Sequence, residues 1–218
     1  MPSSLPRRLT LALALWLAGL AGAAAQEHPV FNTKVEPPQA PVLREMLRKG
    51  GFVIFFRHAA TPDYQEPSPI DFGSCERQRN LNGLGRAQAV MIGEAFRELE
   101  FPVAEVLASP FCRCMDTARL AFGRVAPDEA VRGDKDKLPT LQRLLSSPTA
   151  PGTNRVLVGH GGAAGLLGDE FLREGEAMVV RPDGDDKFTM IARVRAESWT
   201  QFLERHRQPP SGTPRAGQ

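Results

Sequence analysis

The sequence predicts a single three-layer α/β/α domain with a largely parallel central sheet. Apolar runs at residues 52–56, 103–108 and 155–158 are typical of buried strands. Segments with apolar residues at helical spacing separate them, and this alternation favours parallel strands covered by helices on both faces. Two further strands are expected at residues 177–181 and 188–194, and no internal repeat is visible.

The longest predicted helix runs from residue 83 to about residue 100. Asn82 is suited to cap its N-terminus, and its apolar positions include Leu84, Val90 and Phe96. The segment 123–137 is charged, contains Pro and Gly and has no period, so we expect a long surface excursion there. Shorter helices are expected at about residues 42–47, 111–122, 138–145, 161–172 and 198–205.

The N-terminal segment has the pattern of a secretory signal. Arg7 and Arg8 precede an apolar stretch at residues 9–20, and three alanines end the segment at residue 25. The apolar stretch is shorter than the roughly 20 residues that a membrane span needs, although an uncleaved N-terminal anchor is the alternative. We therefore predict a signal peptide at 1–25 and a periplasmic or secreted domain at 26–207. The Pro-, Gly- and Ser-containing tail at 208–218 is predicted to be disordered.

The charge balance argues against several kinds of partner. Removal of Arg7 and Arg8 reduces the 27 Lys and Arg residues to 25, equal to the 25 Asp and Glu residues. A net charge near zero argues against a nucleic-acid partner and against attachment through a polybasic patch. We expect no stable membrane insertion once the signal is cleaved. The three cysteines lack neighbouring histidines, so no metal is expected.

Export would place the cysteines in an oxidising compartment, where one disulfide and one remaining thiol are expected. Cys75 would pair with Cys112 or with Cys114. The last two lie too close in sequence to pair easily with each other.

Polar residues follow three of the predicted strands. Arg57 and His58 follow the first strand, Ser109 and the nearby Arg113 follow the second, and His160 follows the third. A histidine after a strand is by itself more often a packing residue. However, the carboxyl ends of parallel strands form one edge, where ligands bind, so we expect these side chains to converge.

The segments around these residues resemble the histidine phosphatase superfamily, which also contains the cofactor-dependent phosphoglycerate mutases. Residues 56–61 (FRHAAT) resemble its Arg-His-Gly signature, and residues 109–118 match its Ser-Pro-x-x-Arg-x-x-x-Thr-Ala block. Residues 78–89 and 156–161 resemble two further blocks, the second of which contains the second histidine. All four occur in the order that is typical of the family, on its phosphoglycerate mutase-like branch.

The resemblance implies a role for each residue of the cluster. His58 would be the nucleophile that becomes a phosphohistidine, with a nitrogen kept unprotonated by neighbouring cations. Arg57 and Arg113 would hold the phosphate oxygens in bidentate fashion, and His160 would complete the clamp as a charged donor. The backbone N–H groups at Gly161 would add to the anion site. This set requires neither a metal nor another cofactor.

Two positions depart from the family pattern. Ala59 replaces the glycine of the signature, and Gly161 stands where the acid-phosphatase branch has an acidic proton donor. The mutase-like branch instead uses a glutamate after the second arginine block, which favours Glu129 as general acid. Solvated loop positions are the alternative for Glu129 and its acidic neighbours. Some small members act without a clear acid on good leaving groups such as phosphoramidates.

Arg79, Asn82 and Thr61 are further candidates for substrate contact, with a structural role as the alternative for each. Together these inferences predict a metal-independent phosphomonoester hydrolase that acts on a small phosphorylated substrate outside the cytoplasm, such as a sugar or lipopolysaccharide phosphate. The alternative is a non-catalytic phosphate-binding protein that retains the clamp. Specificity would arise from residues 62–77 and 123–137.

Overall fold

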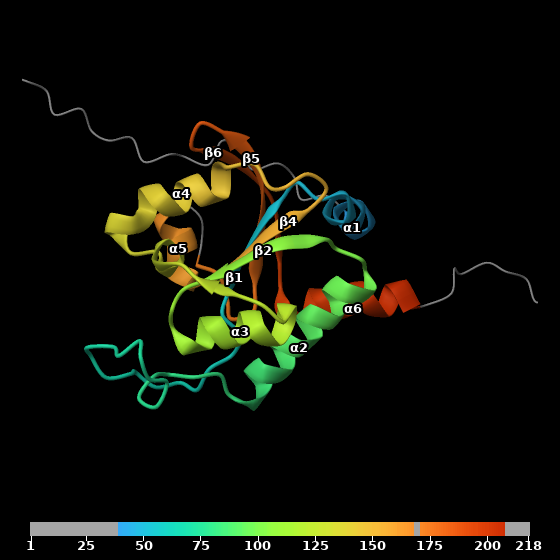
Figure 1. The fold of residues 1–218 in the computed structure, drawn as a ribbon. Coiled ribbons are helices and arrows are strands. Elements are labelled where there is room, and N and C mark those ends of the chain that lie inside the picture. The colour runs from blue at the N-terminus through green and yellow to red at the C-terminus, as the bar shows by residue number, and fades with distance from the viewer. Residues whose placement is uncertain (1–38, 168–170, 208–218) are drawn as a thin grey trace, which may run out of the picture.

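The computed structural model describes residues 39–167 and 171–207. The predicted signal peptide, the lead-in at residues 26–38 and the tail at 208–218 lie outside these residues. A six-stranded sheet lies between two layers of helices, as Figure 1 shows, which confirms the predicted three-layer domain. Among the described residues, no helix combines the length and the apolar character that a membrane crossing requires.

The sheet has a parallel half and an antiparallel half. Its strand order is β3-β2-β4-β1-β5-β6. Neighbours from β3 to β1 are parallel, whereas β5 pairs antiparallel with β1 and with β6. The strands are β1 (Val53–Arg57), β2 (Val103–Ala108), β3 (Ala126–Pro127), β4 (Asn154–Gly159), β5 (Ala177–Gly184) and β6 (Lys187–Val194).

Each face of the sheet packs against its own core. In β1, Ile54 and Phe56 belong to one core, while Val53 and Phe55 belong to the other, as expected for a strand buried on both sides. The first core is covered by α1 (Ala40–Lys49), α2 (Gly83–Glu98), α3 (Cys112–Phe122) and α6 (Ala196–Arg207). The second is covered by α4 (Leu138–Ser146) and α5 (Gly161–Leu166), on the opposite side of the sheet in Figure 1.

Helix α2 confirms the predicted element, but not all of its apolar positions are buried. Leu84 is 63 % exposed and Val90 is 37 % exposed, whereas Ile92 and Phe96 are buried. The helix packs closely on its neighbours through small residues. A Cβ at Gly85 would lie 2.0 Å from the Ala60 carbonyl oxygen. Because the close contact at Gly85 sets how α2 lies on its neighbours, the apolar pattern alone does not show which residues of α2 are buried.

The segment 123–137 is more ordered than the predicted surface excursion. It adds β3 to the sheet edge and forms two 3₁₀ turns, η1 (Glu129–Arg132) and η2 (Lys135–Lys137). Val131 is fully buried in the second core. The Asp128 side chain accepts a hydrogen bond from Ala130 N–H at 2.8 Å. Elements this short leave no periodic signal, which is why the prediction was wrong here.

Helix α5 is also shorter than predicted, since it ends at Leu166 and not near residue 172. Three of its six residues are glycines. Each glycine costs a helix roughly 1 kcal/mol relative to alanine, which limits its length.

Candidate active site

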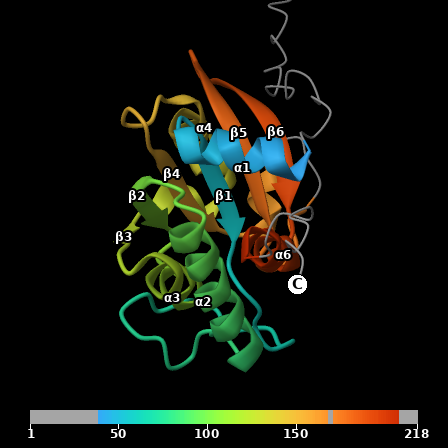
Figure 2. The same cartoon turned by 90° about the vertical axis from the view of Figure 1, so that its right-hand side faces the viewer.

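The carboxyl ends of β1, β2 and β4 meet at one edge of the sheet. His58 donates its backbone N–H to Gly159 O at 3.0 Å, and Ser109 donates to Val158 O at 2.9 Å. The imidazole rings of His58 and His160 therefore meet edge to face, with their centroids 5.5 Å apart. This confirms that the three polar clusters converge. Figure 2 shows β1 running toward the loop that leads from this edge to α2.

The His58 imidazole is buried and oriented. Its Nδ1 lies 2.9 Å from Ala59 O. A carbonyl oxygen only accepts hydrogen bonds, so Nδ1 carries the proton and Nε2 carries the lone pair. Burial lowers the pKa of His58 to about 2; the bond to Ala59 opposes this shift, and the charges of Arg113 and Arg57 reinforce it. The ring is therefore neutral near pH 7, as a nitrogen nucleophile requires.

The structure accommodates alanine in place of the signature glycine. Ala59 is fully buried, and its methyl group packs with Leu81 and Ala89. Its N–H donates to Thr117 Oγ1 at 3.0 Å, and the Thr117 hydroxyl donates to Arg113 O at 2.7 Å. The His58 backbone and the Arg113 helix are thus linked through one threonine.

His160 lies opposite His58 and contacts β2. Its Nε2 lies 3.0 Å from Ser109 Oγ and 3.7 Å from Cys114 Sγ. Burial, followed by the charges of Arg113 and Arg57, lowers the pKa of His160 to about 3. The ring is therefore neutral near pH 7 in this structure. A bound phosphate would favour its charged form, so the charged-donor role stays a prediction.

Arg113 is held by an aromatic side chain that the sequence did not single out. The guanidinium carbon lies 4.2 Å from the centroid of the Phe111 ring, and that ring meets the His160 ring at 4.9 Å. The Arg113 side chain is only 5 % exposed. Its Nε is buried and has no hydrogen-bond partner among the described residues. One edge of the guanidinium thus remains available to an anion.

Arg57 is fixed from the other side of the sheet edge. Its Nη1 donates to Leu172 O at 3.0 Å, and its Nη2 lies 3.4 Å from Glu174 Oε1. Burial lowers the pKa of Arg57, and Glu174 opposes the shift. Gly161 is needed for this packing, because a Cβ there would lie 2.5 Å from Leu172 O and 3.0 Å from Arg57 Cδ. Gly161 therefore affects the site at least by leaving room for the Arg57 side chain.

Thr61 and Asn82 both have structural partners. The Thr61 hydroxyl donates to Glu174 Oε1 at 2.7 Å, and its N–H donates to Oε2 at 3.3 Å. The Asn82 Oδ1 accepts from Gly85 N–H at 2.8 Å and so caps α2 as predicted. Contact of either residue with a substrate stays a prediction. Glu174, which orients both Arg57 and Thr61, was missed because it lies far from them in the sequence.

Two glutamates, Glu129 and Glu66, differ in their exposure and in the arginine that each contacts. Glu129, the predicted general acid, is 56 % exposed and pairs with Arg132 at 3.0 Å on η1. Glu66, which the sequence did not single out, lies 2.9 Å from Arg113 Nη1 and is only 15 % exposed. It also accepts the backbone N–H of Arg79 at 2.9 Å. Glu66 stands eight residues after His58 in a proline-containing loop, where no motif marks it.

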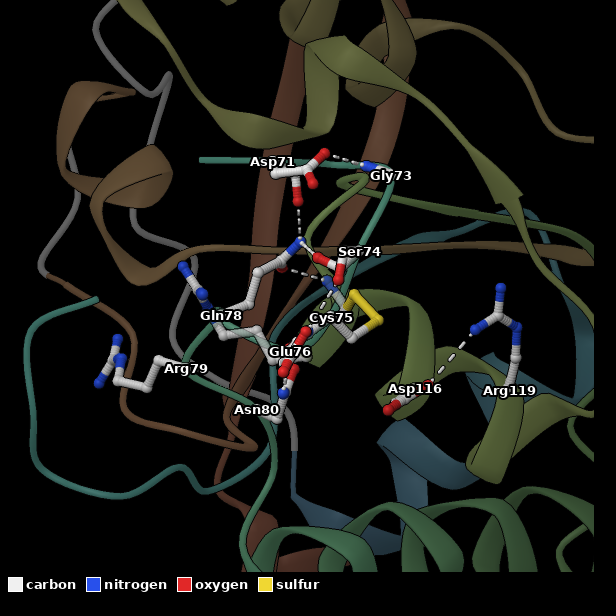
Figure 3. Close-up of a disulfide and its surroundings, with 12 residues drawn as sticks. Asp71, Gly73, Ser74, Cys75, Glu76, Gln78, Arg79, Asn80, Asp116 and Arg119 are labelled. Carbon is white, nitrogen blue, oxygen red and sulfur yellow. Dashed lines mark hydrogen bonds and ion pairs between the residues drawn. A yellow bond between two sulfur atoms is a disulfide. The ribbon is translucent and has the colours of Figure 1, made fainter. Parts of the chain in front are cut away.

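A disulfide joins this loop to α3. Cys75 bonds to Cys112, which selects one of the two expected pairings, and Cys114 is a buried free thiol. Burial raises the pKa of Cys114 to about 12, so this thiol is unreactive near neutral pH. Figure 3 shows the disulfide beside the Gln78 side chain, which reaches back to the loop carbonyls of Asp71 and Ser74.

The described residues contain no group of three His, Cys, Asp or Glu side chains placed to hold a metal ion. They do contain two neutral imidazoles in edge-to-face contact, both under the electrostatic influence of Arg57 and Arg113. The planar guanidinium groups are suited to bind the oxygens of a tetrahedral phosphate group. The unprotonated Nε2 of His58 is suited to attack its phosphorus atom. The fold and the site thus define an α/β protein whose cluster of two histidines and two arginines at the strand ends is chemically suited to a phosphate group.

Residues 53–132 match the family model of the histidine phosphatase superfamily (branch 1). The match includes Arg57, His58 and Arg113. Over this segment the chain is therefore similar to the histidine phosphatase superfamily, and this similarity supports phosphatase activity. No curated protein sequence matches the chain significantly.

Solved structures of the same fold cover most of the described chain. The protein histidine phosphatase SixA, in complex with tungstate, is 13 % identical with a TM-score of 0.51, over 67 % of this chain and 98 % of that one. A candidate phosphohistidine phosphatase SixA from Agrobacterium tumefaciens is 21 % identical with a TM-score of 0.48, over 66 % and 97 %. A mycobacterial glucosyl-3-phosphoglycerate phosphatase with inorganic phosphate is 15 % identical with a TM-score of 0.47, over 68 % and 99 %. At these identities the likeness concerns the fold.

Proposed function

We propose that the protein hydrolyses phosphate monoesters through a phosphohistidine on His58 Nε2. The observation that carries this proposal is the buried His58 ring, which donates Nδ1–H to Ala59 O and so leaves Nε2 unprotonated within the electrostatic influence of Arg113 and Arg57. Phosphoryl transfer depends mainly on positioning and on stabilisation of charge. The side chains of Arg57, Arg113 and His160 supply both.

The reaction proceeds in two displacements. The Nε2 lone pair of His58 attacks phosphorus while the bond to the leaving oxygen breaks. Water then attacks the phosphohistidine and releases phosphate, and the N–P electron pair returns to Nε2. Arg57 and Arg113 hold the phosphoryl oxygens throughout, and His160 takes up a proton when the anion is bound, which strengthens its hydrogen bond.

The proposed substrate is a small phosphorylated compound outside the cytoplasm, such as a sugar phosphate or a lipopolysaccharide phosphate. Two features support a periplasmic or secreted location. The segment 1–25 has the pattern of a signal peptide, and the Cys75–Cys112 disulfide is typical of oxidising compartments. Mass spectrometry of the exported protein is expected to find Gln26 at its N-terminus. Retention of residues 1–25 in the cytoplasmic fraction would count against export.

The activity is tested with p-nitrophenyl phosphate and a panel of sugar phosphates from pH 4 to 8 in EDTA, with the wild type beside His58→Ala. We expect phosphate release that survives EDTA, is lost in the variant and is accompanied by an acid-labile phosphoryl-enzyme. Binding of inorganic phosphate without turnover of any ester would instead identify a phosphate-binding protein.

A further inference from the structure

The loop between β1 and α2, residues 58–82, places a carboxylate on the clamp. Glu66 contacts Arg113 Nη1 through both carboxylate oxygens, at 2.9 Å each. Its Oε2 also accepts the backbone N–H of Arg79 at 2.9 Å. Within the described part of the chain Oε1 contacts Arg113, whereas Oε2 also has a backbone partner that does not depend on Arg113.

The β1–α2 loop is built to hold this position. Gln78 is 2 % exposed and acts as its centre. Its Nε2 donates to Asp71 O at 2.9 Å and to Ser74 O at 3.0 Å, while its Oε1 accepts Cys112 N–H at 2.9 Å. The Cys75–Cys112 disulfide, whose sulfur–sulfur bond is drawn in Figure 3, adds a covalent link to the first residue of α3, next to Arg113 in the sequence. Glu66 is thus presented from a loop that is largely exposed but is tied to α3 through Gln78 and the disulfide.

The other acids near the clamp are less suited to donate a proton. Glu174 accepts bonds from Thr61 N–H, the Thr61 hydroxyl and Arg57, so both of its carboxylate oxygens already have partners. None of these bonds needs to break when a substrate binds, because Glu174 orients the residues behind the clamp. Glu129 is 56 % exposed and pairs with Arg132.

We propose that Glu66 is the proton donor to the leaving group, an inference that rests on the proposed phosphatase function. The phosphoryl group of the substrate takes the place of Oε1 on Arg113. Glu66 then loses its cation and faces a bound anion, and both changes favour the neutral carboxyl group. Oε2 stays on the Arg79 N–H, so the proton lies on Oε1, next to the phosphate.

The proton is conserved over the two displacements. As His58 Nε2 bonds to phosphorus, the P–O bond breaks toward the leaving oxygen, which takes the Oε1 proton and departs as an alcohol. Glu66, now a carboxylate, removes a proton from the incoming water. The water oxygen bonds to phosphorus, the N–P bond breaks toward Nε2, and Glu66 is again protonated.

Substrates with different leaving groups distinguish a residue that donates a proton from one that does not. The p-nitrophenolate ion leaves without a proton, whereas the alkoxide of glycerol phosphate requires one. We expect Glu66→Gln to lower kcat/KM for glycerol phosphate by about 10²-fold or more, and for p-nitrophenyl phosphate by less than about fivefold. Glu76→Gln, an exposed glutamate of the same loop, is the matched control and should change neither value.

Other outcomes overturn the inference in distinguishable ways. Equal losses on both substrates would make Glu66 a positioning residue, and equal gains would make it an anion that competes with the substrate. The wild type gives a test that needs no variant, since a steep fall of kcat/KM with leaving-group basicity means that no proton donor acts. A wild type that turns over neither ester contradicts the proposed function itself.

Discussion

Two regions build the site, and they are held in place by different means. His58 and His160 follow central strands that are buried on both faces, so the two cores fix them. Glu66 and Arg79 come from the β1–α2 loop, most of which is exposed and which depends on Gln78 and one disulfide. Under the proposed mechanism, the strand edge would supply the nucleophile and the clamp, while the loop would supply selectivity toward the leaving group.

The largest effect is expected at the strand edge. His58→Ala removes the nucleophile and should lower kcat by about 10⁴-fold or more on every substrate, good leaving groups included. Steady-state assays and acid-quenched labelling of the enzyme measure this. Labelled enzyme in the variant would place the nucleophile elsewhere, whereas His206→Ala, at an exposed histidine near the end of α6, should behave as the wild type.

Acidification should weaken the same region. The pKa values of His58 and His160 are lowered from 6.5 to about 2 and about 3. Between these values the unfolded chain binds more protons, so the stability present above pH 6.5 is lost as the pH falls. The free energy of unfolding should fall by up to about 1.4 kcal/mol per pH unit for each histidine.

Urea unfolding at pH 7, 6, 5 and 4 measures this slope. His160→Asn should flatten it by the share of one histidine, whereas His206→Gln should leave it unchanged. An unaltered slope in His160→Asn would mean that His160 is protonated in the folded protein.

The disulfide tests the loop separately from the strand edge. Cys75→Ser together with Cys112→Ser should lower the free energy of unfolding by about 2–4 kcal/mol. Turnover of glycerol phosphate should fall by about tenfold, and turnover of p-nitrophenyl phosphate should fall less, because only the proton donor loses its support. Denaturant unfolding and parallel assays provide the values. Equal losses on the two substrates would show that the loop also positions the nucleophile.

The smallest effect is expected for Glu129→Gln. This side chain is exposed, and an exposed ion pair such as that with Arg132 contributes at most about 1 kcal/mol. We expect kcat/KM to stay within about twofold on both esters. A loss confined to glycerol phosphate would instead make Glu129 the acid and remove that role from Glu66.

Much of the strand edge was predictable, because local signals mark it. Apolar runs predict β1 and β4, and a histidine directly follows each strand within a recognisable motif. The orientation of the His58 ring was not predictable, since it depends on the Ala59 carbonyl. Nor was Phe111, which contacts both Arg113 and His160 but reads as an ordinary apolar residue.

The buried face of α2 shows the limit of patterns. Leu84 and Val90 fit an apolar stripe, yet they are exposed, and the helix approaches the Ala60 carbonyl through Gly85 instead. The apolar pattern of α2 shows which of its residues are apolar, whereas the residues that become buried depend on which segment of the chain packs against the helix. The buried turn at Val131 was not predicted for a similar reason, because two-residue strands and 3₁₀ turns show no periodic pattern of apolar residues.

The sequence by itself determined the three-layer fold, the family-like motifs and the polar residues that meet at the strand ends, because each is encoded by neighbours within a few positions. Only the tertiary structure decided which cysteine pairs with Cys75 and which acids meet the two arginines. Glu66 and Glu174 reach Arg113 and Arg57 across 47 and 117 positions. Such contacts are set by how the loops close over the sheet, and no local spacing encodes them.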